Sequence, residues 1–420
     1  MISPARVAPA YLVLFATLYA LQGVVVAYFF NFNTFYMKAA APPVPESLIG
    51  WVQTLATVPL MIKFLGGPLS DRVNLLGLGH RKPYIVLGLV LQSLGLIGLT
   101  QVDPGRHLAG FAALAVVAVL GLALYDTCCD GMVIDVTPPG DRQRVQGTLV
   151  ATRFLATTVC SWGFGHWLAR TGNGPGRGDG VLWVCAAMGL IPLALALAAR
   201  EPRRSAAADA EAFSWDALGV LVRPRALALL AFGALYATVS FGVEINLSLY
   251  YESLGFNSGA VGNFASARYL GRAGGAALFP LLAMRLGRRG VLLGGTLALA
   301  ATTAGQMAVG GGATAAAWGF AFGAANGWLD AAFCVLAMEA SDPRLAASTY
   351  ALFMAVSNVG AAGGGIFSSG VAAAGGKYRP IFLIFGAAAL LALPLAIPLG
   401  RPASTPKPQP EPEPSDELAD

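Results

Sequence analysis

Two arginines lie four residues apart inside an apolar stretch of the sequence. Arg268 and Arg272 occur in the run SARYLGRAGG, ten and fourteen residues after the start of a helix predicted over 258–283. At 1.5 Å per residue they lie ~15–21 Å from that start and share one helix face. Their planar guanidinium groups match carboxylate and phosphate. The pair therefore predicts a site for an anionic group; the alternative is that Glu244 or Asp330 neutralises both arginines as structural ion pairs.

Glu244 is an acidic residue that, like these arginines, lies inside an apolar stretch. It lies in FGVEINLSLYYE, roughly 12 Å from the end of a helix predicted over 225–252. Burial favours a neutral carboxyl and a neighbouring arginine favours a carboxylate, so such a group suits proton coupling. The alternative is a fixed ion pair with Arg268 or Arg272.

A second set of charges lies in the first half of the chain. Lys63 and Arg153 are basic residues within apolar segments, and Asp126 and Asp130 put two carboxylates on one helix face. Either the four form a structural network, or they line a cavity and contact a solute or a proton. Polar and aromatic residues on other helices extend the predicted solute site: Tyr28, Asn31, Asn246, Tyr250, Tyr269 and Asn326. Each of these also fits an ordinary hydrogen bond between helices.

The composition indicates that lipid surrounds the helices that carry these groups. Apolar residues make up 56% of the 420, charged residues only 12%, and the mean hydropathy is +0.64. This excludes a soluble domain, a disordered chain, a secreted disulfide scaffold and a nucleic-acid binder. The five cysteines lie in apolar stretches without metal-ligand spacing, and no nucleotide-binding loop or catalytic constellation occurs, so we expect no enzyme activity, metal or cofactor.

Apolar runs long enough to cross the hydrocarbon predict an all-α membrane protein with twelve transmembrane helices. The predicted spans are 10–31, 48–69, 84–101, 108–136, 144–169, 180–199, 225–252, 258–283, 290–309, 313–339, 346–372 and 380–399. Basic residues concentrate in the loops on the side of the termini, which places both termini in the cytoplasm. The predicted parts are an N-terminal six-helix bundle (1–199), a cytoplasmic central loop (200–224), a C-terminal six-helix bundle (225–400) and a disordered cytoplasmic tail (401–420).

The two halves repeat each other. The tripeptide Leu-Tyr-Ala occurs at 18–20 and again at 235–237. Acids nine residues apart, followed by proline and arginine, occur in both halves: Asp126 with Asp135, and Asp330 with Glu339. Parallel repeats of six helices predict two bundles with a solute site between them.

The sequence also resembles a known family. KFLGGPLSDR at 63–72, followed by GHRKPY at 79–84, is similar to the helix 2–3 signature of the major facilitator superfamily. Within it, residues 48–153 most resemble the anhydromuropeptide permeases and their folate–biopterin and acetyl-CoA transporter relatives, which share the acidic pattern DTCCDG at 126–131 with DV at 135–136. Glycoside–cation symporters share a looser version of these motifs, but the paired acids of their helix 2 are lacking here.

The resemblance implies a secondary active transporter in the plasma (bacterial inner) membrane, with alternating access and proton coupling. It implies a small anionic solute, protons and membrane lipid as partners, and we expect a monomer. It also implies gating contacts at the cytoplasmic ends of the helices, carried by Asp71, Arg72, Asp135, Arg142, Glu339 and Arg344; of these, Asp135 and Glu339 are expected to hold loops against Arg142 and Arg344. The alternatives are a non-transporting assembly or sensing factor on the same fold, and a sugar symporter of the glycoside–cation type.

Overall fold

The computed structural model is helical throughout the part of the chain that it describes, residues 7–66, 69–70, 73–75, 79–138, 141–200, 222–340, 346–373 and 378–401. The first half contains α1 (Pro9–Asn31), α2 (Asn33–Lys38), α3 (Glu46–Ile62) with the 3-10 turn η1 (Lys63–Leu65), α5 (Lys82–Leu99), α6 (Leu108–Val136), α7 (Arg142–Thr171), α8 (Asp179–Met188) and α9 (Leu190–Ala198). The second half contains α11 (Pro224–Ser253), α12 (Ser258–Gly305), η5 (Gln306–Ala308), α13 (Gly312–Ala340), α14 (Ala346–Ala373), α15 (Tyr378–Leu390) and α16 (Leu393–Leu399).

Each predicted span coincides with helix to within a few residues wherever the chain is described. Among the described residues, nine helical segments are long and apolar enough to cross a membrane. The number is smaller than twelve partly because α12 covers two predicted spans, and because α7 carries polar residues such as Arg153 and His166 along its length. Most of the predicted central loop (201–221) and of the predicted tail (402–420) lies outside the described residues.

The chain reverses direction inside α12. Gly287, with φ of 65° and ψ of 170°, has a backbone conformation that glycine adopts without strain. Tyr251 lies close to the start of the first arm and to the end of the second: its ring is 5.1 Å from that of Phe264, and its hydroxyl is 3.3 Å from the side-chain oxygen of Gln306, which directly follows the second arm. The two arms are therefore antiparallel, as two separate predicted spans would be.

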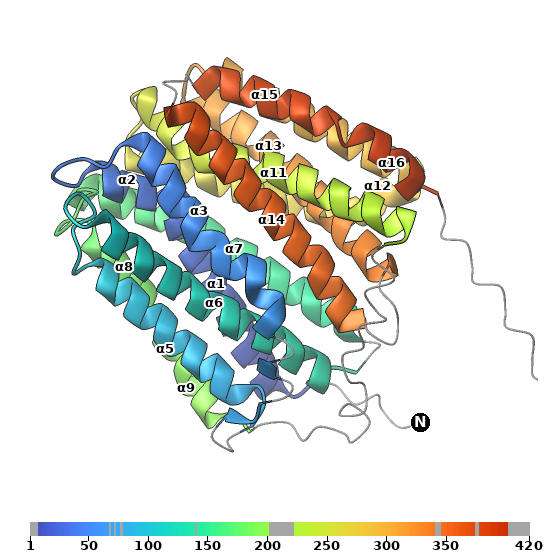
Figure 1. The fold of residues 1–420 in the computed structure, drawn as a ribbon, viewed down its shortest axis with the longest axis horizontal. Helices are drawn as coiled ribbons and strands as arrows, with labels where there is room; N and C mark the ends of the chain where they lie inside the picture. Colours follow the sequence, from blue (N-terminus) through green and yellow to red (C-terminus); the bar gives the residue numbers. More distant parts are fainter. Residues whose placement is uncertain are drawn as a thin grey trace, which may run out of the picture.

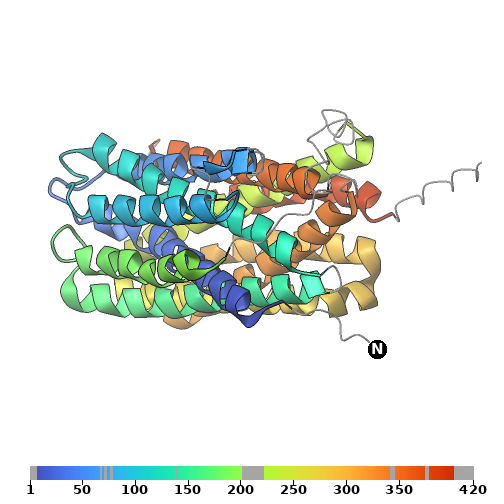
Figure 2. The same ribbon diagram turned by 90° about the horizontal axis from the view of Figure 1, so that it is seen from below.

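The helices form two halves that lie side by side (Figures 1 and 2). Within the first half α1 packs on α7 and α5 on α6; within the second, α11 packs on α14 and α12 on α13. The halves meet where α7 packs on α12 and where α3 packs on α14, and Figure 1 shows α3 beside α14. We call the end of the molecule that carries α2 the Lys38 end, and the opposite end, where α5 begins, the Arg81 end.

At the Lys38 end the two halves are in close backbone contact. A Cβ added to Gly165 of α7 would lie 2.8 Å from the Cα of Gly262 of α12, and one added to Gly262 would lie 2.6 Å from the carbonyl oxygen of Ser161. Ser266 of α12 also donates a hydrogen bond of 2.8 Å to the carbonyl oxygen of Thr158. This conformation is closed at the Lys38 end.

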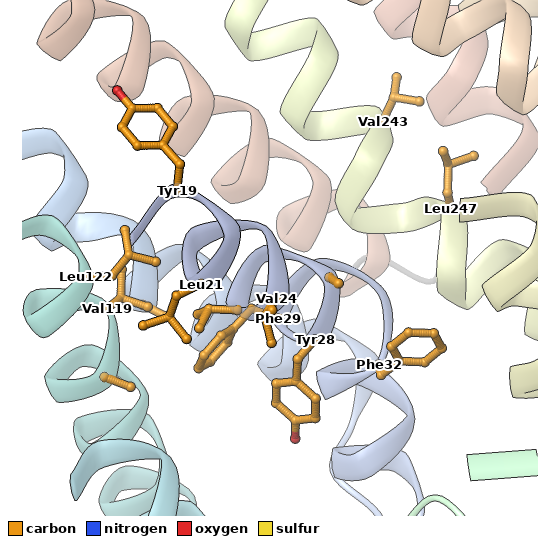
Figure 3. Packing of buried hydrophobic residues seen from close by; sticks show 14 of the residues in the cluster. Tyr19, Leu21, Val24, Tyr28, Phe29, Phe32, Val119, Leu122, Val243 and Leu247 are labelled. Carbon is orange, nitrogen blue, oxygen red and sulfur yellow. The ribbon is translucent and has the colours of Figure 1, made fainter. Parts of the chain in front are cut away.

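Apolar side chains fill the interior and also cover the outside. Leu21 and Val24 of α1 face Val119 and Leu122 of α6 in the interior (Figure 3). Large apolar residues such as Leu155, Leu190 and Leu391 are more than half exposed. A membrane solvates such a surface, which water would not.

Candidate functional site

Four charged side chains of the second half form one connected group, which we call the C-half cluster: Glu244 of α11, Arg268 and Arg272 of α12, and Asp330 of α13. Arg272 donates to Asp330 Oδ2 from Nη2 at 2.6 Å and from Nε at 3.1 Å. Its Nη1 lies 3.7 Å from Glu244 Oε2. Arg268 Nη2 lies 3.3 Å from Glu244 Oε1, which accepts a hydrogen bond of 2.7 Å from Tyr269. Two cations and two carboxylates thus balance each other, as the ion-pair alternative anticipated.

Arg268 joins this cluster to the other half. Its Nη2 donates a 2.6 Å hydrogen bond to Oδ1 of Asn31 in α1. Asn31 is held in turn by its own amide, which donates to the carbonyl oxygen of Ala27 at 2.9 Å. Arg268 is only 3% exposed and its Nε has no partner within the described part of the chain. A buried charge is thus shared between the two halves.

Charged side chains of the first half form the N-half cluster: Lys63, Asp126, Asp130 and Arg153. Lys63 Nζ lies 2.9 Å from Asp126 Oδ2, and Gln22 Nε2 donates to Asp126 Oδ1 at 2.6 Å. The Tyr19 hydroxyl donates to Asp130 Oδ1 at 2.5 Å. Arg153 of α7 lies with its Cζ 5.1 Å from the centre of the Phe154 ring.

The hydrogen bonds of the two halves repeat each other. Tyr19 of α1 donates to Asp130 of α6, and Tyr236 of α11 donates to Asp330 of α13 at 2.8 Å. Gln22 contacts Asp126 in the first half, and Ser240 donates to Asn326 at 3.0 Å in the second. Asp330 therefore corresponds to Asp130. The sequence repeat had matched Asp330 with Asp126, which lies one helical turn away from Asp130.

The other residues predicted to bind solute lie in several places. Tyr28 contacts Asn33 at 3.4 Å and points to the side of α1 opposite Tyr19 (Figure 3). The amide of Asn246 donates to Ser368 of α14 at 2.7 Å. Tyr250 donates to the carbonyl oxygen of Gln306 at 3.1 Å inside the second half. Of the predicted set, the structure brings Tyr269 and Asn31 to the C-half cluster and leaves Tyr28, Asn246 and Tyr250 away from it.

Two of the predicted gating acids bind arginines other than those expected. Asp135 accepts from Arg81 Nε at 3.3 Å, and Glu339 pairs with Arg288. The predicted partners were Arg142 and Arg344. Arg344, Asp71 and Arg72 lie outside the described residues, as does the side chain of Arg142.

Sequence reasoning missed a third charged group, which we call the Lys38 cluster: Lys38, Glu46, Glu252 and Tyr378. Lys38 Nζ lies 2.9 Å from Glu46 Oε1 and 2.9 Å from Glu252 Oε2 at the end of α11. Tyr378 of α15 donates to Glu46. The Lys38–Glu252 and Tyr378–Glu46 contacts cross from one half to the other. The sequence offered only an acid before the predicted span 48–69 and another at the end of the predicted span 225–252, neither of which is a signal by itself.

The charge of Lys38 persists at ordinary pH. Burial lowers the pKa of this ammonium, but its contacts with Glu46 and Glu252 outweigh burial, so the pKa is raised. A group whose pKa is raised on folding contributes stability below its ordinary pKa and loses it only as the pH rises further. Lys38 therefore stays protonated throughout the neutral range.

We predict that Glu252→Gln weakens closure at the Lys38 end. The variant removes one ion pair between the halves, which costs less than about 1 kcal/mol because the group is partly exposed, yet shifts the population toward opening. Spin labels on Arg106→Cys and Leu254→Cys, in a background without native cysteines, report the separation of the halves. A longer mean distance in Glu252→Gln is expected. Asp141→Asn, at the Arg81 end, is the matched control; equal distances in both variants would contradict the prediction.

A family model and a curated relative match the sequence of this chain. The family model of the Major Facilitator Superfamily matches residues 7–267 and 227–419. The anhydromuropeptide permease of Escherichia coli (strain K12) is 33% identical over 143 residues, which are 34% of this chain and 28% of the permease. The match therefore spans less than a third of that relative.

Solved structures share the fold at low sequence identity. The nucleoside transporter NupG superposes with a TM-score of 0.71 at 14% identity, over 93% of this chain and 98% of NupG. A bacterial homolog of the human lysosomal transporter Spinster, in an inward-facing and occupied conformation, gives 0.70 at 14% identity, over 93% and 95%. A D-xylose–proton symporter gives 0.69 at 16% identity, over 92% and 95%.

Proposed function

The chain belongs to the major facilitator superfamily, and on that premise we propose that it moves a small organic anion across the membrane together with protons, by alternating access. It is a transporter rather than an enzyme, and an integral membrane protein with several spans. The proposed topology has twelve spans in two bundles of six, with both termini in the cytoplasm. In that orientation the Lys38 end faces outward, and the present conformation is closed to the outside.

The observation that carries the proposal is the position of Arg268 between the two halves. This buried arginine binds Glu244 in its own half and Asn31 in the other, at 3.3 Å and 2.6 Å. A change in the charge of Glu244 therefore alters an interaction between the halves. A transport cycle needs such a link, because alternating access is the movement of one half against the other around a central site.

Glu244 is the proposed proton-coupling residue. With Glu244 ionised, the C-half cluster carries no net charge, since Arg268 and Arg272 face Glu244 and Asp330. Protonation of Glu244 leaves a net positive charge, which is costly at this depth in a membrane. An anionic solute that binds at the same time restores neutrality. Proton and anion are therefore expected to bind together and to travel in the same direction.

An anhydromuropeptide is the first solute to test. The name of the E. coli relative supplies this candidate, and muropeptides carry carboxylates, which suit arginine-rich sites. The two paired arginines alone do not select among organic anions.

We predict that Glu244→Gln abolishes proton-driven accumulation. Purified protein in proteoliposomes should accumulate a labelled anhydromuropeptide when the outside is made acidic, and Glu244→Gln should lower that accumulation at least tenfold because glutamine cannot release a proton. The variant should still exchange internal for external solute at equal pH, since solute binding remains.

Asp103→Asn, which changes a loop acid at the Lys38 end, is the matched control and should transport like the wild type. Proton-driven accumulation by Glu244→Gln at the wild-type rate would contradict the coupling role. Binding of the solute by the wild type without any flux or exchange would instead favour the non-transporting sensing factor.

A further inference from the structure

Arg153 stands apart from the other basic residues at the middle of the molecule. Lys63 pairs with Asp126, Arg268 with Glu244, and Arg272 with both Glu244 and Asp330. Arg153 has neither an ion pair nor a hydrogen bond to any described residue through its side chain. It lies within about 5 Å of the midpoint of α7, as judged from the helical rise. A charge without a partner at such depth is costly, which implies that something compensates it during function.

Arg153 also lies at the boundary between the halves. Its Cζ is 5.1 Å from the centre of the Phe154 ring, and the Cζ of Arg272, in the other half, is 5.8 Å from the same ring centre. The two guanidinium groups are therefore no farther apart than these two distances together. The Phe154 ring thus lies close to two arginines from opposite halves: Arg153, which has no ion pair to a described residue, and Arg272, which has two.

We propose that Arg153 receives the anionic group of the solute, a carboxylate or a phosphate, with Phe154 and Arg272 completing the site. The inference rests on the proposed function and assigns its anion-binding role to Arg153, in place of the Arg268–Arg272 pair that the sequence indicated. Arg268 and Arg272 already have carboxylate partners, so binding an anion there requires breaking ion pairs. The guanidinium of Arg153 has no ion pair to a described residue that an anion would have to displace. Its planar geometry suits both carboxylate and phosphate.

A solute bound at Arg153 would link the two halves of the molecule. A solute held by Arg153 in the first half and close to Arg272 in the second contacts both halves at once. Its departure leaves Arg153 without an ion pair to any described residue again. The anion thus supplies part of the attraction between the halves, and only while it is bound.

The test measures binding and stability of the full chain in detergent, at constant ionic strength maintained with chloride. Inorganic phosphate, benzoate and an anhydromuropeptide are the probes, with benzamide as the uncharged partner of benzoate. At least one anion should raise the thermal unfolding midpoint of the wild type, and benzamide should not. Arg153→Gln should bind that anion at least tenfold more weakly, and Arg153→Lys should retain part of the affinity. Arg106→Gln, a change in an exposed loop, should bind like the wild type.

A second measurement separates solute binding from a structural role. Without any probe, Arg153→Gln should unfold at the same temperature as the wild type or at a higher one, because it removes an unpaired charge. A lower unfolding temperature, unchanged anion affinity in Arg153→Gln, or no stabilisation of the wild type by any anion would each overturn the assignment. Stabilisation by benzoate but not by phosphate identifies the anionic group as a carboxylate, and the reverse result identifies it as a phosphate.

The outcomes also distinguish this inference from the proposed function. Anion binding that depends on Arg153, without proton-driven flux in proteoliposomes, would leave the site standing and remove the transport proposal. Proton-driven flux that persists in Arg153→Gln would remove the site and leave the transport proposal standing.

Discussion

Arg272→Met is expected to destabilise the folded protein by about 3 kcal/mol, because it removes the cation that the buried Glu244 and the half-buried Asp330 share. Arg272 holds Asp330 through two hydrogen bonds and lies 3.7 Å from Glu244. Methionine fills most of the side-chain volume, so the loss reports the charge rather than a cavity. The thermal unfolding midpoint in detergent measures the effect.

A double variant decides whether the loss comes from this pair. Arg272→Met combined with Asp330→Asn should recover more than half of the lost stability, since the neutral amide no longer requires a cation and can still accept from Tyr236. Arg170→Met, at an exposed position near the end of α7, is the matched control and should leave the midpoint unchanged. Simple addition of the two single effects in the double variant would contradict coupling between Arg272 and Asp330.

The helices could be predicted from the sequence because lipid leaves an apolar run of some twenty residues few alternatives to a helix. The reversal at Gly287 was expected, because the short basic stretch MRLGRR at 284–289 separates two predicted spans there. The charged residues at mid-depth were also recognisable, because their cost in a membrane makes them rare.

Which acid meets which base could not be predicted, because the pairing depends on how each helix is rotated about its own axis. Asp135 was matched with Arg142 along the chain, yet Arg81 of a neighbouring helix reaches it. Asp330 was matched with Asp126, one helical turn from its true counterpart Asp130, because both acids lie on the same helix face and the sequence does not distinguish them. Hydrogen bonds from Tyr19 and Tyr236 reveal the correct match.

The Lys38 cluster shows a second limit. A lysine or glutamate at the water-exposed end of a predicted helix is common and carries no signal by itself. Only the folded chain brings Lys38 and Glu252, more than two hundred residues apart in sequence, to 2.9 Å.

Gly275→Ala and Gly274→Ala are expected to have opposite effects, although they add the same methyl group to neighbouring positions of α12. A Cβ on Gly275 would lie 1.9 Å from the carbonyl oxygen of Ala324 in α13, whereas one on Gly274 meets nothing within 4 Å. Because the obstacle is backbone, a whole helix must move, and we expect Gly275→Ala to cost about 3 kcal/mol or more. Gly274→Ala should be neutral or gain about 0.5–1 kcal/mol, since alanine favours the helix.

The same methyl group on Gly275 should also disturb the charges, because α12 carries Arg272 and α13 carries Asp330. The contact surface continues there: a Cβ on Gly327 of α13 would lie 1.9 Å from the carbonyl oxygen of Arg272. Separation of the two helices therefore lengthens the Arg272–Asp330 pair, and any Gly275→Ala protein that does fold should accumulate solute more slowly than Gly274→Ala. Unfolding midpoints and proteoliposome uptake, measured on both variants, test the two effects together. Equal stability of the two variants would mean that α12 and α13 do not pack through Gly275 in the membrane.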